Sequence, residues 1–174
     1  MTKDTTRSFS SEKLLFLFGD SEGCISEATA ELLDRLNLSY RDASEAEIEE
    51  YIIRYINIIR NPKINRNTEE NYEAWLNGWY ENLNLIIESG ATEDNCKPGY
   101  FRDNHLLRFN GSLIYSDNPQ IEHDLFKICR SYIFDTYLSE YDCIHEFGCG
   151  SGGNLLELSK RFKNKSIIGY DWVE

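Results

Sequence analysis

Long apolar stretches are missing from this chain of 174 residues. The longest apolar run, Leu14–Phe18, is far shorter than the roughly 20 residues that a membrane-spanning helix needs. The N-terminal sequence MTKDTTRSFS lacks the apolar stretch and the cleavage site of a signal peptide. With three prolines and 11 glycines, the chain is neither collagen-like nor a proline-rich linker. We therefore expect a soluble, cytoplasmic protein with no membrane partner.

Basic residues are scarce relative to acidic ones. The 18 lysines and arginines are outnumbered by 30 aspartates and glutamates, which gives a formal net charge of −12. Such a charge repels phosphate backbones at long range, so we expect no nucleic-acid partner. Most of these carboxylates are expected to form a solvated surface that aids solubility.

Cysteine and histidine spacings typical of metal or disulfide-exchange sites are also missing. Five cysteines are scattered along the chain without a CxxC pair: Cys24, Cys96, Cys129, Cys143 and Cys149. The three histidines lack metal-ligand spacing as well. An odd number of scattered cysteines is typical of reduced thiols in a cytosol, and no metal site is predicted.

Enough apolar material is present for a folded core. Hydrophobic residues make up 41% of the chain and aromatic residues 13%, which excludes an intrinsically disordered chain. Residues 1–13 are polar and predict a frayed tail, and Leu14–Phe18 predicts a short buried strand. Apolar residues at helical spacing then predict three helices, over residues 25–36, 48–59 and 68–90. A capping box of Ser44 and Glu47 should begin the second. The third should turn seven side chains inward: Tyr72, Trp75, Leu76, Trp79, Leu83, Ile86 and Ile87.

The helical pattern breaks after residue 90. Between residues 91 and 117, turn residues mix with scattered apolar residues and the short run Leu113–Tyr115, in a pattern that alternates loosely like strands. Asn118-Pro119 predicts the start of a further helix. The last part of the chain predicts a strand, a glycine turn, a helix and a second strand, at Cys143–Phe147, Gly148–Gly153, Asn154–Phe162 and Ser166–Tyr170.

The glycine turn is the most informative segment for function. Glycines allow a sharp turn and let a ligand approach the backbone more closely than any Cβ would permit. The helix that follows offers free N–H groups and positive potential at its N-terminus. Asp171 ends the second strand, where a carboxylate can accept hydrogen bonds from both hydroxyls of a ribose. Together these features predict half of a doubly wound nucleotide-binding unit.

The glycine turn is compatible with two kinds of nucleotide cofactor. Gly148, Gly150 and Gly153 satisfy the GxGxxG pattern of dinucleotide sites, which keeps a nicotinamide cofactor open. Glu146 lies two residues before the first glycine, at the mouth of the predicted site. A carboxylate there repels a pyrophosphate and attracts an ammonium group.

The amino-acid sequence of the turn also favours a cofactor other than a dinucleotide. Glu-Phe-Gly-Cys-Gly-Ser-Gly-Gly-Asn-Leu, which begins at Glu146, closely resembles motif I of the class I S-adenosylmethionine-dependent methyltransferases. Ile-Ile-Gly-Tyr-Asp, at 167–171, resembles the second motif of that family, a strand that ends in an acid. The resemblance covers the chain from about residue 140 onward, and residues 1–117 resemble no family.

The resemblance implies S-adenosyl-L-methionine as the cofactor and methyl transfer to a small-molecule acceptor. It implies six cofactor-binding residues: Glu146, Gly148, Gly150, Gly152, Asp171 and Trp172. The glutamate would lie near the methionine amino group and the three glycines along the ribose and methionine. The aspartate would hold the ribose hydroxyls, and the tryptophan would cover the adenine. No residue is assigned as a general base.

The fold class that follows is α/β. We expect a frayed tail (1–13), a mostly helical N-terminal region (14–116) and the start of an S-adenosylmethionine-binding domain (117–174), which is the first part of a doubly wound Rossmann-like methyltransferase sheet. Because the family's sheet has further strands, we expect the chain to be the N-terminal portion of a longer enzyme, truncated after the second strand and inactive alone.

Two other functions stay open, an NAD(P)-dependent oxidoreductase and a noncatalytic helical interaction module. The segment Tyr100–Arg108 also concentrates arginines and aromatic residues in an acidic chain. It could form a lid over an anionic part of the acceptor, with His105 as a base, or its arginines could simply pair with surrounding acids.

Overall fold

A computed structural model describes residues 6–20, 22–61, 69–97 and 104–172. These residues form a mixed α/β structure with six helices and two small sheets. The chain divides into two compact units, each built from two separate stretches of sequence. Unit 1 comprises Met1–Ile64 and Arg102–Asp135, and unit 2 comprises Asn65–Phe101 and Thr136–Glu174. The expected succession of a helical region and a cofactor-binding domain stays a prediction.

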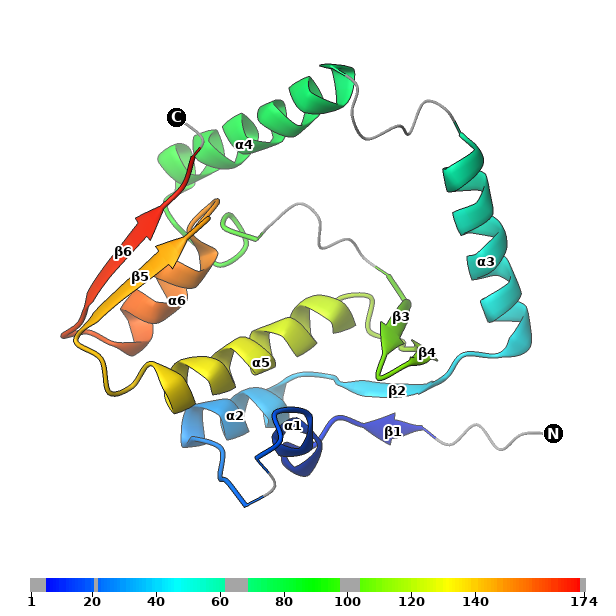
Figure 1. Cartoon of the computed structure of the whole chain (residues 1–174), viewed down its shortest axis with the longest axis horizontal. Helices are drawn as coiled ribbons and strands as arrows, with labels where there is room; N and C mark the ends of the chain where they lie inside the picture. Colours follow the sequence, from blue (N-terminus) through cyan, green and yellow to red (C-terminus); the bar gives the residue numbers. More distant parts are fainter. Residues whose placement is uncertain (1–5, 21, 62–68, 98–103, 173–174) are drawn as a thin grey trace. The chain divides into compact units, whose positions relative to one another are not determined.

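Unit 1 contains an antiparallel sheet with the strand order β1-β2-β4-β3 (Figure 1). Its strands are short: β1 (Arg7–Ser8), β2 (Ser39–Asp42), β3 (Leu106–Phe109) and β4 (Ser112–Tyr115). The loose strand-like pattern expected after residue 90 corresponds to the hairpin of β3 and β4. Asn110 and Gly111 connect them with φ values of +47° and +82°. Positive φ at both positions is what a two-residue type I′ turn requires.

The core of unit 1 is formed by three helices and by residues next to β1 and β2. The helices are α1 (Ser11–Leu17), α2 (Glu27–Arg35) and α5 (Ile121–Tyr137). The buried cluster consists of Phe9, Leu14, Leu38, Ile121, Leu125, Ile128 and Tyr132. A buried polar contact joins α2 to α5, since Thr29 Oγ1 lies 2.8 Å from Ser131 Oγ. Both hydroxyls are thereby satisfied away from water.

The predicted strand at Leu14–Phe18 is wrong. The first four of these residues belong to α1, and Phe18 is the C-cap of that helix. Ser10 caps this helix by accepting a hydrogen bond from the backbone N–H of Lys13. Leu14 is fully buried, whereas Phe16 on the opposite side is exposed. A five-residue apolar run is too short for its periodicity to distinguish strand from helix. The expected frayed tail is wrong in its later part, because residues 7–8 form β1 and residues 11–13 begin α1.

Helix α3 (Glu45–Arg60) begins at the predicted capping box. Ser44 Oγ accepts from the Glu47 N–H, and the Glu47 carboxylate accepts from the Ser44 N–H at 2.7 Å. Arg41 donates two hydrogen bonds to the same carboxylate, at 2.8 and 2.6 Å. These bonds lower the pKa of Glu47 to about 2. No residue of α3 is buried, so its apolar stripe, which includes Ile52 and Ile56, is exposed.

Unit 2 contains a long helix and a strand–turn–helix–strand motif. Its elements are α4 (Glu69–Ser89), β5 (Cys143–Phe147), α6 (Gly153–Arg161) and β6 (Ser166–Tyr170). Both strands have the bounds that the sequence predicted, and they pair in parallel with Glu146 opposite Gly169. The helices predicted at 68–90 and 154–162 are confirmed. The proposed cap of the first, Thr68, lies outside the described residues.

The two faces of the β5–β6 pair differ. On one face, Leu158 of α6 and Ile144 of β5 are buried, and Gly169 allows the helix to lie close, because a Cβ at Gly169 would overlap the Leu155 side chain. On the other face, the rings of Phe147 and Tyr170 stack with centroids 5.0 Å apart, and Phe147 is 80% exposed. A doubly wound sheet has helices on both faces. The α/β class is confirmed, and the Rossmann-like architecture stays a prediction.

Candidate functional site

The predicted glycine turn lies between β5 and α6. Gly148, Gly150 and Gly152 all have left-handed backbone, with φ values of +75°, +52° and +79°. L side chains rarely adopt this conformation, so alternate glycines are needed for the chain to turn here. Gly152 is also the N-cap of α6 and provides no side-chain hydrogen bond to the first turn. The first backbone N–H groups of α6 therefore donate no hydrogen bond to an N-cap side chain.

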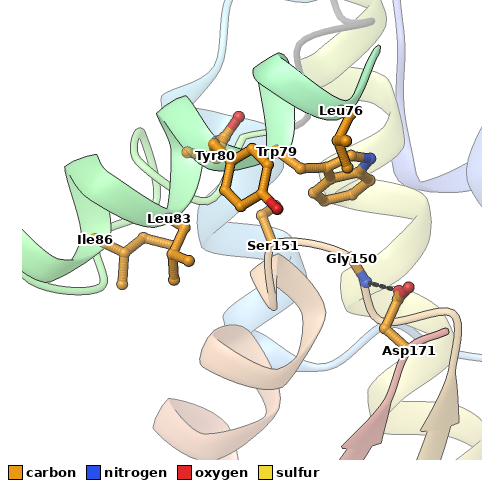
Figure 2. Close-up of a pocket in the computed structure, with 9 residues that line it drawn as sticks. Leu76, Trp79, Tyr80, Leu83, Ile86, Gly150, Ser151 and Asp171 are labelled. Atoms are coloured by element: carbon orange, nitrogen blue, oxygen red, sulfur yellow. Dashed lines mark hydrogen bonds between the residues drawn. The ribbon is translucent and has the colours of Figure 1, made fainter. Parts of the chain in front are cut away.

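Hydrogen bonds tie the turn to the end of β6. The backbone N–H groups of Gly148 and Cys149 both donate to the carbonyl oxygen of Tyr170, at 2.7 and 3.1 Å. Asp171 follows directly, and its Oδ2 accepts from the Gly150 N–H at 2.6 Å (Figure 2). Its Oδ1 accepts from the Trp172 N–H at 2.8 Å. The carboxylate expected to bind a ribose thus lies against the middle of the glycine turn.

A second carboxylate lies at the other side of the turn. Glu146 is half-buried near the end of β5, and its Oε1 accepts a hydrogen bond from Asn154 Nδ2 at 2.5 Å. The effect of the two acids is visible at Cys149, inside the turn. Burial raises the pKa of the Cys149 thiol, and the negative charges of Asp171 and Glu146 raise it further. Two carboxylates therefore lie close to the turn, and their charges favour a cationic ligand over an anionic one.

A pocket of about 240 Å³ opens beside the turn. One wall is the turn and the end of β6, represented by Gly150, Ser151 and Asp171. The other wall comes from α4 (Figure 2) and consists of Leu76, Trp79, Tyr80, Asn82, Leu83 and Ile86. Four of these lie at helical spacing on one face of α4, as the sequence predicted. They line a pocket, however, and do not form a close-packed core. Tyr72 and Ile87, also expected to point inward, are exposed.

The indole ring of Trp79 closes part of the pocket over the turn. A Cβ placed on Gly150 would lie 2.6 Å from Cη2 of this ring. A Cβ on Gly148 would meet no atom within 4 Å. The backbone at Gly148 is therefore open to a ligand, whereas the Trp79 ring already covers the backbone at Gly150.

The segment that follows α4 holds that helix against the turn. Asn82 of α4 donates from Nδ2 to the Asn95 carbonyl at 2.8 Å. One residue later, the Cys96 carbonyl accepts from Ser151 Oγ at 2.7 Å. Cys96 is buried, which raises the pKa of its thiol. These two hydrogen bonds connect α4 to the glycine turn through residues 95–96, and α4 therefore belongs to the candidate site.

The structure brings five of the six predicted site residues to the turn. Glu146, the three glycines and Asp171 surround it as described above. Trp172 is 74% exposed and is not among the residues that line the pocket. His105 belongs to unit 1, where its Nδ1 lies 2.8 Å from the Ser116 carbonyl and its ring stacks on Tyr115. Residues 100–103 of the predicted lid lie outside the described residues.

The wall supplied by α4 was missed. Its aromatic residues were noted in the sequence but were assigned to a core, because a helical stripe does not reveal what it faces. Ser151 and Asn82 carried no signal of their own. Their contacts depend on the turn at residues 92–97, where apolar periodicity is absent.

Comparisons with known proteins provide no information about the site. No protein-family model, no curated protein and no solved structure matches the chain. Among the described residues, no group of three or more His, Cys, Asp or Glu is placed to hold a metal ion. None of the described helices combines the length and the apolar character needed to cross a membrane.

Proposed function

We propose that the glycine turn and Asp171 bind S-adenosyl-L-methionine and that the protein is a methyltransferase acting on a small molecule. The observation that carries the proposal is the turn itself. Three alternate left-handed glycines connect a parallel strand to a helix, with a carboxylate on each side. The sequence resemblance to the methyltransferase motifs falls on the same residues.

The residues around the turn suit this cofactor better than a dinucleotide. S-adenosylmethionine carries a sulfonium and an ammonium group, whereas NAD carries a pyrophosphate. The pKa of Cys149 is raised first by burial and then by the charges of Asp171 and Glu146, and these two charges disfavour a pyrophosphate and favour the cations. The open backbone at Gly148 leaves room for close approach of a ligand.

In this proposal each residue has a positioning role. Asp171 accepts hydrogen bonds from the ribose hydroxyls, and Glu146 faces the methionine ammonium group. Trp172 is proposed to cover the adenine from outside the pocket. The bound cofactor would supply an electrophilic methyl group for in-line transfer to an oxygen, nitrogen or carbon nucleophile. The turn and α4 would contribute by orienting the reactants and excluding water.

The Rossmann-like sheet and the cytoplasmic location belong to the same proposal. The exposed aromatic face of the β5–β6 pair suits a sheet that further helices and strands cover. All five cysteines are free thiols, as is usual in a reducing compartment.

Isothermal titration calorimetry on the protein tests the cofactor directly. S-adenosylhomocysteine should bind with micromolar affinity, and NAD should not bind. Gly150→Val should abolish binding, because its side chain crowds the turn. Gly111→Val is the matched control, since Gly111 has a similar left-handed φ but lies in the β3–β4 hairpin. Binding of NAD alone would assign the turn to an oxidoreductase, and retained binding in Gly150→Val would remove the turn from the site.

Tryptophan fluorescence gives an independent readout. A ligand that crosses the backbone at Gly150 has to displace the Trp79 ring, which lies in contact with it. S-adenosylhomocysteine should therefore change the emission of the wild-type protein. The change should be smaller in Trp79→Phe than in the wild-type protein, because only the part from Trp172 over the adenine would remain, while the calorimetric affinity stays measurable.

A further inference from the structure

The pocket beside the glycine turn is divided into an apolar and a polar part. Figure 2 shows Leu83 and Ile86 at one end, Tyr80 and Ser151 in the middle, and Gly150 and Asp171 at the other end, where Leu76 and Trp79 of α4 also lie. The apolar end is built entirely by α4. The polar end carries a carboxylate and a backbone N–H that are hydrogen-bonded to each other at 2.6 Å.

The size of the pocket restricts what it can hold. Its volume of about 240 Å³ is below the range of about 300–1,000 Å³ found for sites that enclose drug-sized ligands. The pocket therefore accommodates one part of a ligand and leaves the remainder outside. That part must be apolar on the side facing α4 and must carry hydrogen-bond donors on the side facing Asp171.

We propose that this pocket receives the nucleoside part of the cofactor, with the base against the apolar face of α4 and the ribose hydroxyls toward Asp171. The inference rests on the proposed function and adds to it a base-binding wall formed by Leu83 and Ile86, at the end of the pocket away from Gly150. These residues lie in a part of the chain that resembles no known family.

The chemistry of a nucleoside matches both ends of the pocket. A purine has flat faces that bind well to aromatic and aliphatic side chains. A ribose presents two neighbouring hydroxyl donors, and a carboxylate accepts hydrogen bonds on both of its oxygens. Tyr80 and Leu83 are each about half exposed, so a bound base would cover apolar surface that now faces water. The acids near the turn disfavour a phosphate at the same place.

Two leucines of α4 form a matched pair for the test. Leu83 lines the pocket and is 51% exposed, whereas Leu85 is 48% exposed and does not line it. Leu83→Asp and Leu85→Asp therefore make the same chemical change on the same helix at nearly equal exposure. Both variants should fold, because neither side chain is buried. Circular dichroism checks this, and Leu83→Asn replaces Leu83→Asp if the charge disturbs the helix.

Three probes separate the base from the rest of the ligand. S-adenosylhomocysteine, adenosine and S-ribosylhomocysteine, which lacks the base, are titrated into the full-length protein by calorimetry. Leu83→Asp should weaken binding of the two adenine-containing probes at least tenfold and change S-ribosylhomocysteine less than twofold. Leu85→Asp should change all three less than twofold.

The outcomes distinguish this inference from the proposed function. If S-adenosylhomocysteine binds and both aspartate variants bind it equally well, the pocket proposal is overturned and the methyltransferase proposal stands. If adenosine binds in a Leu83-dependent way but S-adenosylhomocysteine does not bind, the nucleoside pocket is supported and the methyltransferase proposal fails. If Leu83→Asp weakens S-ribosylhomocysteine as much as S-adenosylhomocysteine, the base does not lie on α4. If the wild-type protein binds none of the probes, both proposals are overturned.

Discussion

Gly150→Ala tests the contact between the glycine turn and α4 through the free energy of unfolding. Alanine at a left-handed position costs about 1–2 kcal/mol from its backbone conformation alone. Its Cβ would also lie 2.6 Å from Cη2 and 3.1 Å from Cζ3 of Trp79, so the ring has to move. Overpacking of this kind costs about 1–3 kcal/mol. The total destabilisation should be about 2–5 kcal/mol.

Gly148→Ala is the matched control within the same turn. Its φ of +75° is also left-handed, but no atom lies within 4 Å of the added Cβ. It should therefore lose only the conformational part, about 1–2 kcal/mol. Urea unfolding followed by circular dichroism measures both variants against the wild-type protein.

The Trp79 contribution is isolated by a double-mutant cycle. In a Trp79→Ala background the extra cost of Gly150→Ala over Gly148→Ala should disappear, because no ring remains to be displaced. Equal destabilisation by Gly150→Ala and Gly148→Ala in the wild-type background would show that α4 does not lie against the turn. The same result would remove the wall on which the nucleoside pocket depends.

Three further outcomes follow from the site and its surroundings. Asp171→Asn should weaken S-adenosylhomocysteine binding by about 1–3 kcal/mol, and it should lower the pKa of Cys149, which the pH dependence of alkylation followed by mass spectrometry would report. Glu47→Gln should reduce the free energy of unfolding at neutral pH by about 1 kcal/mol. Arg41 lowers the folded-state pKa of Glu47 from 4.5 to about 2. The stabilisation is therefore present above about pH 4.5 and is lost between that pH and pH 2. The free energies of unfolding of variant and wild type, measured with urea, should converge at the acid end. Phe147→Lys should reduce self-association in sedimentation velocity, since this ring is 80% exposed on an uncovered sheet face.

The sequence predicts well the helix and strand ends that depend on interactions between residues close together in the chain. Ser44 and Glu47 are three residues apart, and their reciprocal hydrogen bonds begin α3 where the capping box predicts. The strands around the glycine turn are equally readable, because the turn marks the end of β5 and Asp171 marks the end of β6. Each of these features depends on neighbours within a few residues.

Features that depend on distant contacts are not readable in the same way. Leu14 is buried because α1 packs on residues of α5, and the five-residue apolar run around it is compatible with either helix or strand. Trp79 lies at core spacing, but only the folded chain shows that it faces Gly150. The candidate site was therefore predictable on the side of the turn and not on the side of α4.

The order of the strands in unit 1 has a consequence for synthesis on the ribosome. β2 pairs on one side with β4, so that Asp42 lies opposite Ile114, and both α3 and α4 are made between these two strands. At about 5–20 residues per second, the inner edge of β2 stays unpaired for several seconds after it emerges. The apolar stripe of α3, which is exposed in the folded chain as well, adds to the accessible apolar surface. The nascent chain should therefore be sensitive to protease and attractive to chaperones until β4 emerges, and it should gain protection in one late step.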